Sequence, residues 1–241
     1  MPLEQMDAKQ VAHYLHADVR EVIKLASRGQ IPCRKVGGMF VFLKGQVDHW
    51  VEDQMHELGG RRLAGIEKGV SAHHGFEHSD LIGPMIPRDP GGIAVPLKAK
   101  TRDSTVRALV ELAELSDLVY NRDELTSEIF RREDLCSTAL FPAVALPHPR
   151  HPLPYDIAES FIVVGLAAGG GIPFGSSRGD MTRLFFLVCC KDERTHLHVL
   201  ARLARMLDDK AGLAEMLAAA STEQLRGLLA AREAAVLAQG H

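Results

Sequence analysis

A histidine held between two prolines suggests phosphoryl-transfer chemistry. His148 lies between Pro147 and Pro149 in the stretch ALPHPR, directly after an apolar run that is typical of a strand. Proline fixes the backbone torsion φ and removes a backbone donor, so this imidazole is held stiffly. Histidine ordinarily has a pKa near ~6.5, which leaves one ring nitrogen free as a nucleophile at neutral pH.

The other parts of such a site are also present. A phosphoryl group in flight is loosely bonded, so a protein mainly positions it and balances its charge, which an arginine fork does well. Arg132 in FRREDLCST is one candidate, and Arg150 follows His148 by two residues. His196 lies in the amphipathic stretch THLHVLARLARML, whose N-terminus would offer free amides and Thr195 a cap. Spacing alone does not place these groups together.

Other interpretations of the histidines stay open. His148 could be a surface histidine in a proline-rich loop. It could also ligate a metal with His151 and His196, although the intervening prolines make that geometry awkward. A second group, His73, His74 and His78, falls in a polar segment that is more typical of a linker than of a metal site. His198, two residues after His196, is expected on the surface of its helix.

Length and composition limit the classes of protein. The 241 residues are 46% hydrophobic, enough for one large domain or two small ones, and the net charge of -3 excludes a globally basic nucleic-acid binder but not a local basic face. The four cysteines have neither zinc nor disulfide spacing, which indicates a reducing compartment. Neither a membrane-spanning run nor a signal pattern is present, so we expect a cytoplasmic protein.

The elements that must position these side chains follow from apolar patterning. Loss of that patterning divides the chain into residues 1–58, a linker at 59–78 and residues 79–241. In the last part, short apolar runs of strand length alternate with helical patterns, which indicates an α/β domain. Strands are predicted over 142–147, 161–167 and 184–190, and helices over 104–119, 123–134, 195–207 and 222–236.

The first part carries a segregated basic surface. Two short helical patterns precede a hairpin signal at Gly37-Gly38, and a third helix is predicted over 44–55. The second helix is expected to have an apolar face of Val19, Val22, Ile23 and Ala26. Beside it, basic side chains recur at i, i+4 and i+8; they are Arg20, Lys24 and Arg28. A helix of this kind suits the major groove of DNA, where basic groups neutralise phosphates. A solvated helix surface is the alternative.

The order of these N-terminal elements resembles the excisionase-like, MerR-related winged helix-turn-helix family. The residues that carry the likeness are Gly29, Ile31, Pro32, Val36 to Gly38 and Trp50. The resemblance implies DNA binding through four basic residues, which are Arg20, Lys24 and Arg28 in the helix and Lys35 in the wing.

From residue 79 to the last predicted helix, the sequence resembles the enzyme IIA domain of the bacterial phosphotransferase system, in its fructose/mannitol and nitrogen-regulatory class. The residues that carry the likeness are Arg132-Glu133, Ser137-Thr138, Leu146-Pro147-His148, residues 171–174, His196-Leu197, Leu200-Ala201 and Leu203-Ala204. It implies a mixed β-sheet flanked by helices, with His148 as the phospho-acceptor, Arg132 binding phosphoryl oxygens and His196 as a second active-site histidine. The implied donor is the histidine-containing phosphocarrier protein or its nitrogen-branch relative. The resemblance implies neither a cofactor nor a metal at the site.

The sequence departs from the family pattern around the histidine. The family's glycine-rich approach is here ALFPAVA, which contains no glycine, and Pro149 and Gly175 replace a glycine and an acidic residue. Glycine permits positive φ, which alanine and proline do not readily adopt. Either the site works with a different loop, or phosphotransfer has been lost and the domain serves as a sensor or docking surface.

Together these features predict a transcriptional regulator in which phosphorylation of His148 alters binding to DNA or to a partner protein. Two alternatives are a relay component that passes phosphate to a sugar permease, and an interaction module that is not phosphorylated. Winged heads often act in pairs, which favours a homodimer.

Overall fold

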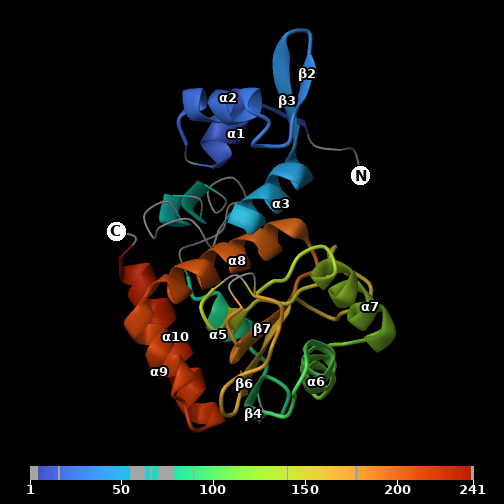
Figure 1. The fold of residues 1–241 in the computed structure, drawn as a ribbon, viewed down its shortest axis with the longest axis vertical. Coiled ribbons are helices and arrows are strands. Elements are labelled where there is room, and N and C mark those ends of the chain that lie inside the picture. Colours follow the sequence, from blue (N-terminus) through green and yellow to red (C-terminus); the bar gives the residue numbers. More distant parts are fainter. Residues whose placement is uncertain are drawn as a thin grey trace.

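A computed structural model describes residues 5–15, 17–54, 63–65, 67–69, 79–88, 90–139, 141–176 and 179–239. Within them an N-terminal head is stacked on a larger C-terminal body along the long axis of the molecule (Figure 1). Of the predicted linker, residues 63–65 and 67–69 are helical. The histidines at 73, 74 and 78 lie outside the described residues.

The head is a three-stranded sheet with three helices. Its elements are β1 (Gln5–Asp7), α1 (Ala8–Tyr14), α2 (Val19–Ser27), β2 (Arg34–Val36), β3 (Met39–Leu43) and α3 (Lys44–Gln54). The strand order is β1-β3-β2, with antiparallel pairing throughout. Asp7 and Asp18 cap α1 and α2 by accepting from free amides in the first turn of each helix. The three helices and the hairpin match the sequence prediction, whereas β1 is too short to show an apolar alternation.

The hairpin of β2 and β3 forms the predicted wing. Gly37 and Gly38 adopt φ of +57° and +85°, a backbone conformation that side chains disfavour, which is why a Gly-Gly pair suits this turn. The wing points away from the body in Figure 1. Behind it, Trp50 of α3 donates from Nε1 to the Gln30 carbonyl at 2.6 Å and so fixes α3 against the end of α2.

The body contains a four-stranded mixed sheet. Its strands are β4 (Ile93–Leu97), β5 (Val144–Ala145), β6 (Phe161–Ala167) and β7 (Leu184–Cys189). They lie in the order β4-β6-β7-β5, with β6 and β7 antiparallel and each outer strand parallel to its neighbour. Every residue of β6 and β7 is buried, because helices cover both faces of the sheet.

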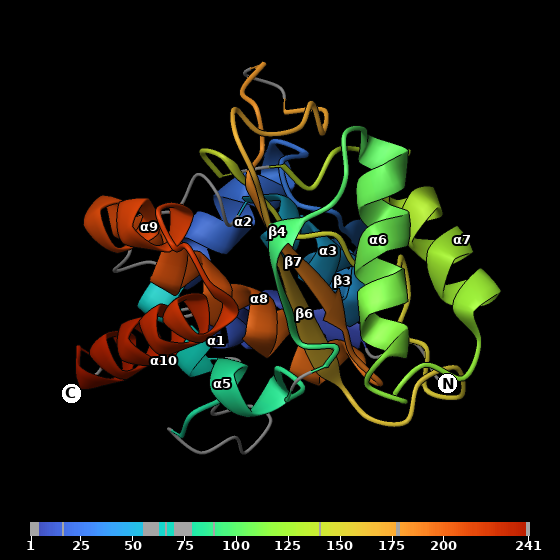
Figure 2. The same ribbon diagram turned by 90° about the horizontal axis from the view of Figure 1, so that it is seen from below.

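The helices lie in two layers. They are α5 (Ile82–Met85), α6 (Arg102–Glu114), α7 (Arg122–Glu133), α8 (Glu193–Asp208), α9 (Lys210–Leu217) and α10 (Thr222–Ala238). Figure 2 shows α6 and α7 on one face of the sheet and α8 with α10 on the other. The apolar core is divided in the same way, since alternate residues of β6 and β7 belong to different clusters. The expected cap of α8 was wrong: Asp192, not Thr195, accepts from the first turn.

Head and body share one core. α3 lies along α8 in Figure 1, and the two helices are in contact. Val47 and Val51 of α3 are fully buried and belong to the same apolar cluster as Leu197 and Leu200 of α8. Among the described residues, no helix has the length and apolarity needed to cross a membrane.

Candidate functional site

The backbone leading to His148 is anchored on both sides. The Leu146 N–H donates to the Thr138 carbonyl at 3.2 Å. The Val188 N–H of β7 donates to the Pro147 carbonyl at 2.9 Å. Because the two residues before His148 are bonded to different neighbours, and prolines flank it, the ring is held in one place at the end of β5.

The two ring nitrogens of His148 have different partners. Nδ1 lies 2.8 Å from the Leu146 carbonyl, which can only accept, so Nδ1 carries the proton and Nε2 keeps its lone pair. Arg132, in the last turn of α7, donates from Nε to this Nε2 at 3.0 Å. The Arg132 Nη1 also donates to the Cys136 carbonyl at 3.2 Å, which fixes the plane of the guanidinium. The ring therefore has one nucleophilic nitrogen, and it faces a positive charge.

His196 completes the group. Its ring centroid lies 4.7 Å from that of His148, with the ring planes tilted by 55°. It belongs to the first turn of α8, where the Thr195 N–H donates to Asp192 Oδ1 at 2.9 Å. The structure thus brings together the three residues that the sequence analysis named for phosphoryl transfer, from α7, from the loop after β5 and from α8.

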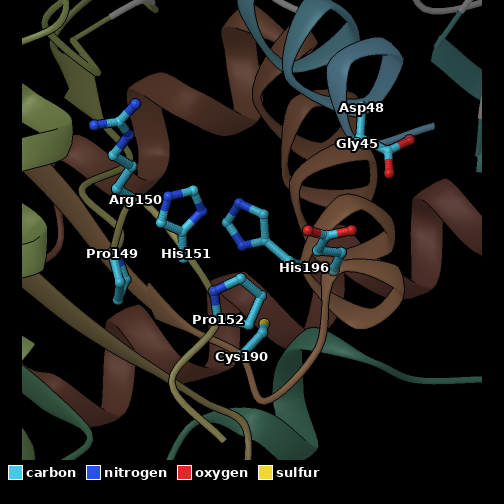
Figure 3. Close-up of a pocket in the computed structure, with 9 residues that line it drawn as sticks. Gly45, Asp48, Pro149, Arg150, His151, Pro152, Cys190 and His196 are labelled. Carbon is cyan, nitrogen blue, oxygen red and sulfur yellow. The ribbon is translucent and has the colours of Figure 1, made fainter. Parts of the chain in front are cut away.

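The nucleophilic ring has little contact with solvent. His148 is 4% exposed and Arg132 is 6% exposed. A narrow pocket lies on the His196 side of His148. It is lined from the body by Pro149, Arg150, His151, Pro152, Cys190, Glu193 and His196, and from the head by Gly45 and Asp48. Figure 3 shows the His151 and His196 rings side by side in this pocket, while the Arg150 side chain points away from them.

A buried carboxyl group supports the loop behind the histidine. Glu133 accepts from the Thr138 N–H at 3.2 Å and from the Thr138 hydroxyl. Burial raises the pKa of Glu133, and the hydrogen bonds from Thr138 and the charge of Arg132 oppose that rise. Because Thr138 in turn accepts from Leu146, Glu133 acts as a positioning residue for the segment that carries His148.

The four predicted DNA-binding side chains are all exposed on the head; they are Arg20, Lys24, Arg28 and Lys35. α2 buries Val22 and Ala26 on its inner face, which leaves the basic stripe outside. Ile23, expected on the apolar face, is 41% exposed. α2 and the wing lie at the end of the molecule furthest from the body (Figure 1). The basic surface is therefore accessible while the head is docked.

Comparison with known families supports both parts. A family model described as "Phosphoenolpyruvate-dependent sugar phosphotransferase system, EIIA 2" matches residues 89–231, and a helix-turn-helix domain model matches residues 6–55. The chain belongs to the EIIA type 2 family. The sequence analysis predicted an EIIA domain of the mannitol/nitrogen-regulatory type that follows a helix-turn-helix head, and this prediction is confirmed. The predicted α/β fold with its mixed sheet is also confirmed.

Individual relatives cover the EIIA domain. The mannitol-specific EIICBA component of Vibrio cholerae is 25% identical over 143 residues, which are 59% of this chain and 21% of that protein. This chain thus spans about a fifth of the length of that relative. The solved nitrogen regulatory protein IIA-Ntr of Neisseria meningitidis has 23% identity and a TM-score of 0.55, with 62% of this chain and 99% of that chain covered.

Two solved structures from Escherichia coli share the fold of this EIIA domain. The IIA mannitol protein has 23% identity and a TM-score of 0.51, covering 57% of this chain and 94% of its own. A complex of IIA mannitol with phosphorylated IIB mannitol has 22% identity and a TM-score of 0.53, covering 60% of this chain and 96% of that chain.

The backbone segment that leads to His148 lacks the family's glycines and is strained at one residue. Ala143, immediately before β5, has φ of +59°. This is the left-handed region, which costs a residue with a Cβ roughly 1–2 kcal/mol. The Ala143 carbonyl accepts from both Arg183 and Leu184, so the strained residue is held in place by β7.

A buried ionic cluster on α8 was missed by sequence analysis. His198, expected on the helix surface, is 2% exposed, and that expectation was wrong. Arg202, one turn later, donates to Glu67 of the linker segment and to Glu233 of α10, the latter at 2.8 Å. Burial alone raises the pKa of Glu67, but the His198 hydrogen bond and the charges of Arg202 and Arg205 outweigh it and lower that pKa to about 2. The i, i+4 spacing of His198 and Arg202 places both side chains on one face of the helix, and it was the signal in the sequence that could have indicated this cluster.

The metal alternative receives no support from the geometry. Within the part of the chain that the structure describes, no group of three or more His, Cys, Asp or Glu side chains is arranged to hold a metal ion. The possible ligand set of His148, His151 and His196 is therefore not such a group.

Proposed function

We propose that this chain is a DNA-binding regulator whose EIIA domain accepts a phosphoryl group on His148 from a phosphohistidine carrier protein. The observation that carries the proposal is the fixed tautomer of His148, with Nδ1 bonded to Leu146 and Nε2 facing Arg132 at 3.0 Å. Neither nitrogen needs to be deprotonated before attack, because Nε2 already holds its lone pair.

This geometry supports the following transfer. Nε2 of His148 attacks the phosphorus of the carrier's phosphohistidine as the donor's P–N bond breaks, and the bonding pair leaves with the carrier's imidazole. The Arg132 guanidinium, which now donates to Nε2, turns its N–H groups to the phosphoryl oxygens and balances their charge. His196 lies close enough to donate to another of these oxygens. The product carries about two added negative charges at neutral pH.

The test of the acceptor is intact-mass measurement after incubation with phosphoenolpyruvate and the two general relay proteins. We expect the wild-type chain to gain one phosphoryl group and His148→Ala to gain none. His151→Ala, which removes the neighbouring pocket histidine, is the matched control and should gain one. Equal phosphorylation of His148→Ala would refute the assignment.

The DNA-binding half of the proposal rests on the helix-turn-helix match and the exposed basic stripe of α2. In a gel-shift series against salt, we expect log affinity to fall linearly with log salt, with a shallower slope in Lys24→Ala and Arg28→Ala. Lys9→Ala removes the same charge from an exposed site on α1 and should leave the slope unchanged. Equal slopes in all variants would argue for a protein-binding head.

A second candidate is a relay component for a sugar permease. It is favoured by the solved complex of IIA mannitol with phosphorylated IIB mannitol, and by the mannitol-specific EIICBA relative. Phosphoryl transfer from the phosphorylated chain to a mannitol-type IIB domain would support it. Retention of the phosphoryl group on this chain in the presence of that domain would favour the function as a DNA-binding regulator.

A further inference from the structure

The DNA-binding head forms part of the candidate phospho-acceptor site. Gly45 and Asp48 of α3 line the same pocket as His151, Glu193 and His196 of the EIIA domain (Figure 3). A Cβ placed on Gly45 would lie 3.9 Å from both carboxylate oxygens of Glu193, so α3 passes directly over the first turn of α8. That turn also carries His196, whose ring packs on His148.

Asp48 is held firmly in this wall. Its carboxylate accepts from the Tyr14 hydroxyl at 3.0 Å and from Lys44 Nζ at 2.7 Å, within the head itself. Burial raises the pKa of Asp48, the bonded Lys44 opposes that rise, and the charge of Glu193 adds to it. The docked head thus places one carboxyl group near a second one on α8, beside the ring that would receive a phosphoryl group.

The docked head also leaves little room for a donor. The pocket has a cavity volume of about 20 Å³, which is enough for about one water molecule. His148 is only 4% exposed. Transfer between two histidines requires the donor's ring to come within reach of Nε2, and a side chain as covered as His148 does not allow that approach. For a carrier that approaches from the side of His196, at least one wall of the pocket must therefore move, and α3 is the wall that belongs to the head.

We propose that the head gates the phospho-acceptor: α3 must leave α8 before a phosphohistidine carrier reaches His148. Once present, the phosphoryl group adds negative charge to the wall that already carries Glu193, and its repulsion of Asp48 disfavours redocking of α3. This inference rests on the proposed function, since it describes the regulation of the same site. By linkage, any ligand that binds only the displaced head also shifts the equilibrium towards the phosphorylated chain, and phosphorylation strengthens binding of that ligand by the same factor.

The first arm of the test compares phosphorylation rates of full-length variants. Gly45→Glu adds bulk and a like charge opposite Glu193, and we expect it to accept phosphate at least about fivefold faster, a typical coupling. Gln46→Glu, with the same charge at an exposed neighbour, should match the wild type. Glutamate has a higher helix propensity than glycine and about the same propensity as glutamine, so we expect α3 to be retained in these variants.

The second arm needs no substitution. Hydrogen exchange of the α3 amides is measured before and after phosphorylation, and we expect faster exchange in the phosphorylated chain. Equal rates in the wild type, Gly45→Glu and Gln46→Glu, or a phosphorylated chain with unchanged α3 exchange, would overturn the gate while leaving the acceptor intact. Phosphorylation of Gly45→Glu but not of the wild type would support the gate. If neither protein gains a phosphoryl group, the proposed function fails and the gate fails with it.

Discussion

At the scale of single residues, the chemistry of the site is decided by which nitrogen of His148 carries a proton. The Leu146 carbonyl fixes the proton on Nδ1, and the lone pair on Nε2 faces Arg132. An arginine is suited to this place because its planar guanidinium bonds the Cys136 carbonyl and the ring at the same time. A lysine presents a point charge that cannot hold both partners in one plane.

Removal of the Arg132 guanidinium should therefore slow phosphoryl transfer to His148. We expect Arg132→Gln to lower the rate of His148 phosphorylation by roughly 100-fold or more, the usual effect of losing one electrostatic donor at a transferring group. Arg132→Lys should recover only part of that loss. Single-turnover labelling from the phosphorylated carrier measures both. Arg131→Gln, an exposed neighbour on α7, serves as the control, and a rate for Arg132→Gln equal to that of this control would remove Arg132 from the mechanism.

At the scale of elements, β5 and its entry carry the least regular backbone near the site. Ala143 takes up a left-handed conformation in a stretch with no glycine, and two backbone amides before and in β7 hold its carbonyl. The family pattern places glycines in this approach, and the fold retains the conformation without them.

Ala143→Gly should relieve that strain. We expect the free energy of unfolding to rise by roughly 0.5–1 kcal/mol, since the gain from removing the Cβ exceeds the added entropy of the unfolded chain. Urea unfolding measures the change. Ala145→Gly, in β5 with ordinary φ, should instead lower stability because glycine weakens a strand. A loss of stability in both variants would mean that Ala143 is not strained.

Apolar patterning predicted the elements that carry the site but not their neighbours. The long runs of β6 and β7 and the periodic faces of α6, α8 and α10 were visible, because burial on one or both faces dictates their composition. β4 was missed since Pro96 interrupts a short run, and α9 follows α8 with a break of a single residue. Arg132, His148 and His196 were placed together by family resemblance, since three separate elements supply them. His198 was misplaced because the segment that buries it belongs to the predicted linker.

At the scale of the whole molecule, α8 joins the two halves. Its first turn carries His196 and meets α3, and its middle holds the ionic cluster that binds Glu67. Glu67 and Leu63 are each 1% exposed, so these two residues of the predicted linker are packed into the molecule. The boundaries 1–58, 59–78 and 79–241 stay a prediction.

The Glu67 cluster should make stability sensitive to acid. The pKa of Glu67 is lowered from 4.5 to about 2 in the folded chain, so its contribution is complete above 4.5 and is lost as the pH falls towards 2. That shift corresponds to about 3 kcal/mol at neutral pH. Glu67→Gln should be less stable than the wild type at neutral pH, and the difference should shrink on acidification, as measured by denaturant unfolding at several pH values. Glu215→Gln on the exposed side of α9 is the control; a pH-independent difference for Glu67→Gln would contradict the assignment.

The chain contains one tryptophan in 241 residues, and it lies in α3. Trp50 is half-buried, with its indole Nε1 bonded to the Gln30 carbonyl at 2.6 Å. Fluorescence excited at wavelengths that tryptophan absorbs and tyrosine does not therefore originates from the helix that packs on α8. A shift in its wavelength or intensity reports on the surroundings of that helix alone, so the docking of the head can be followed optically in the native chain.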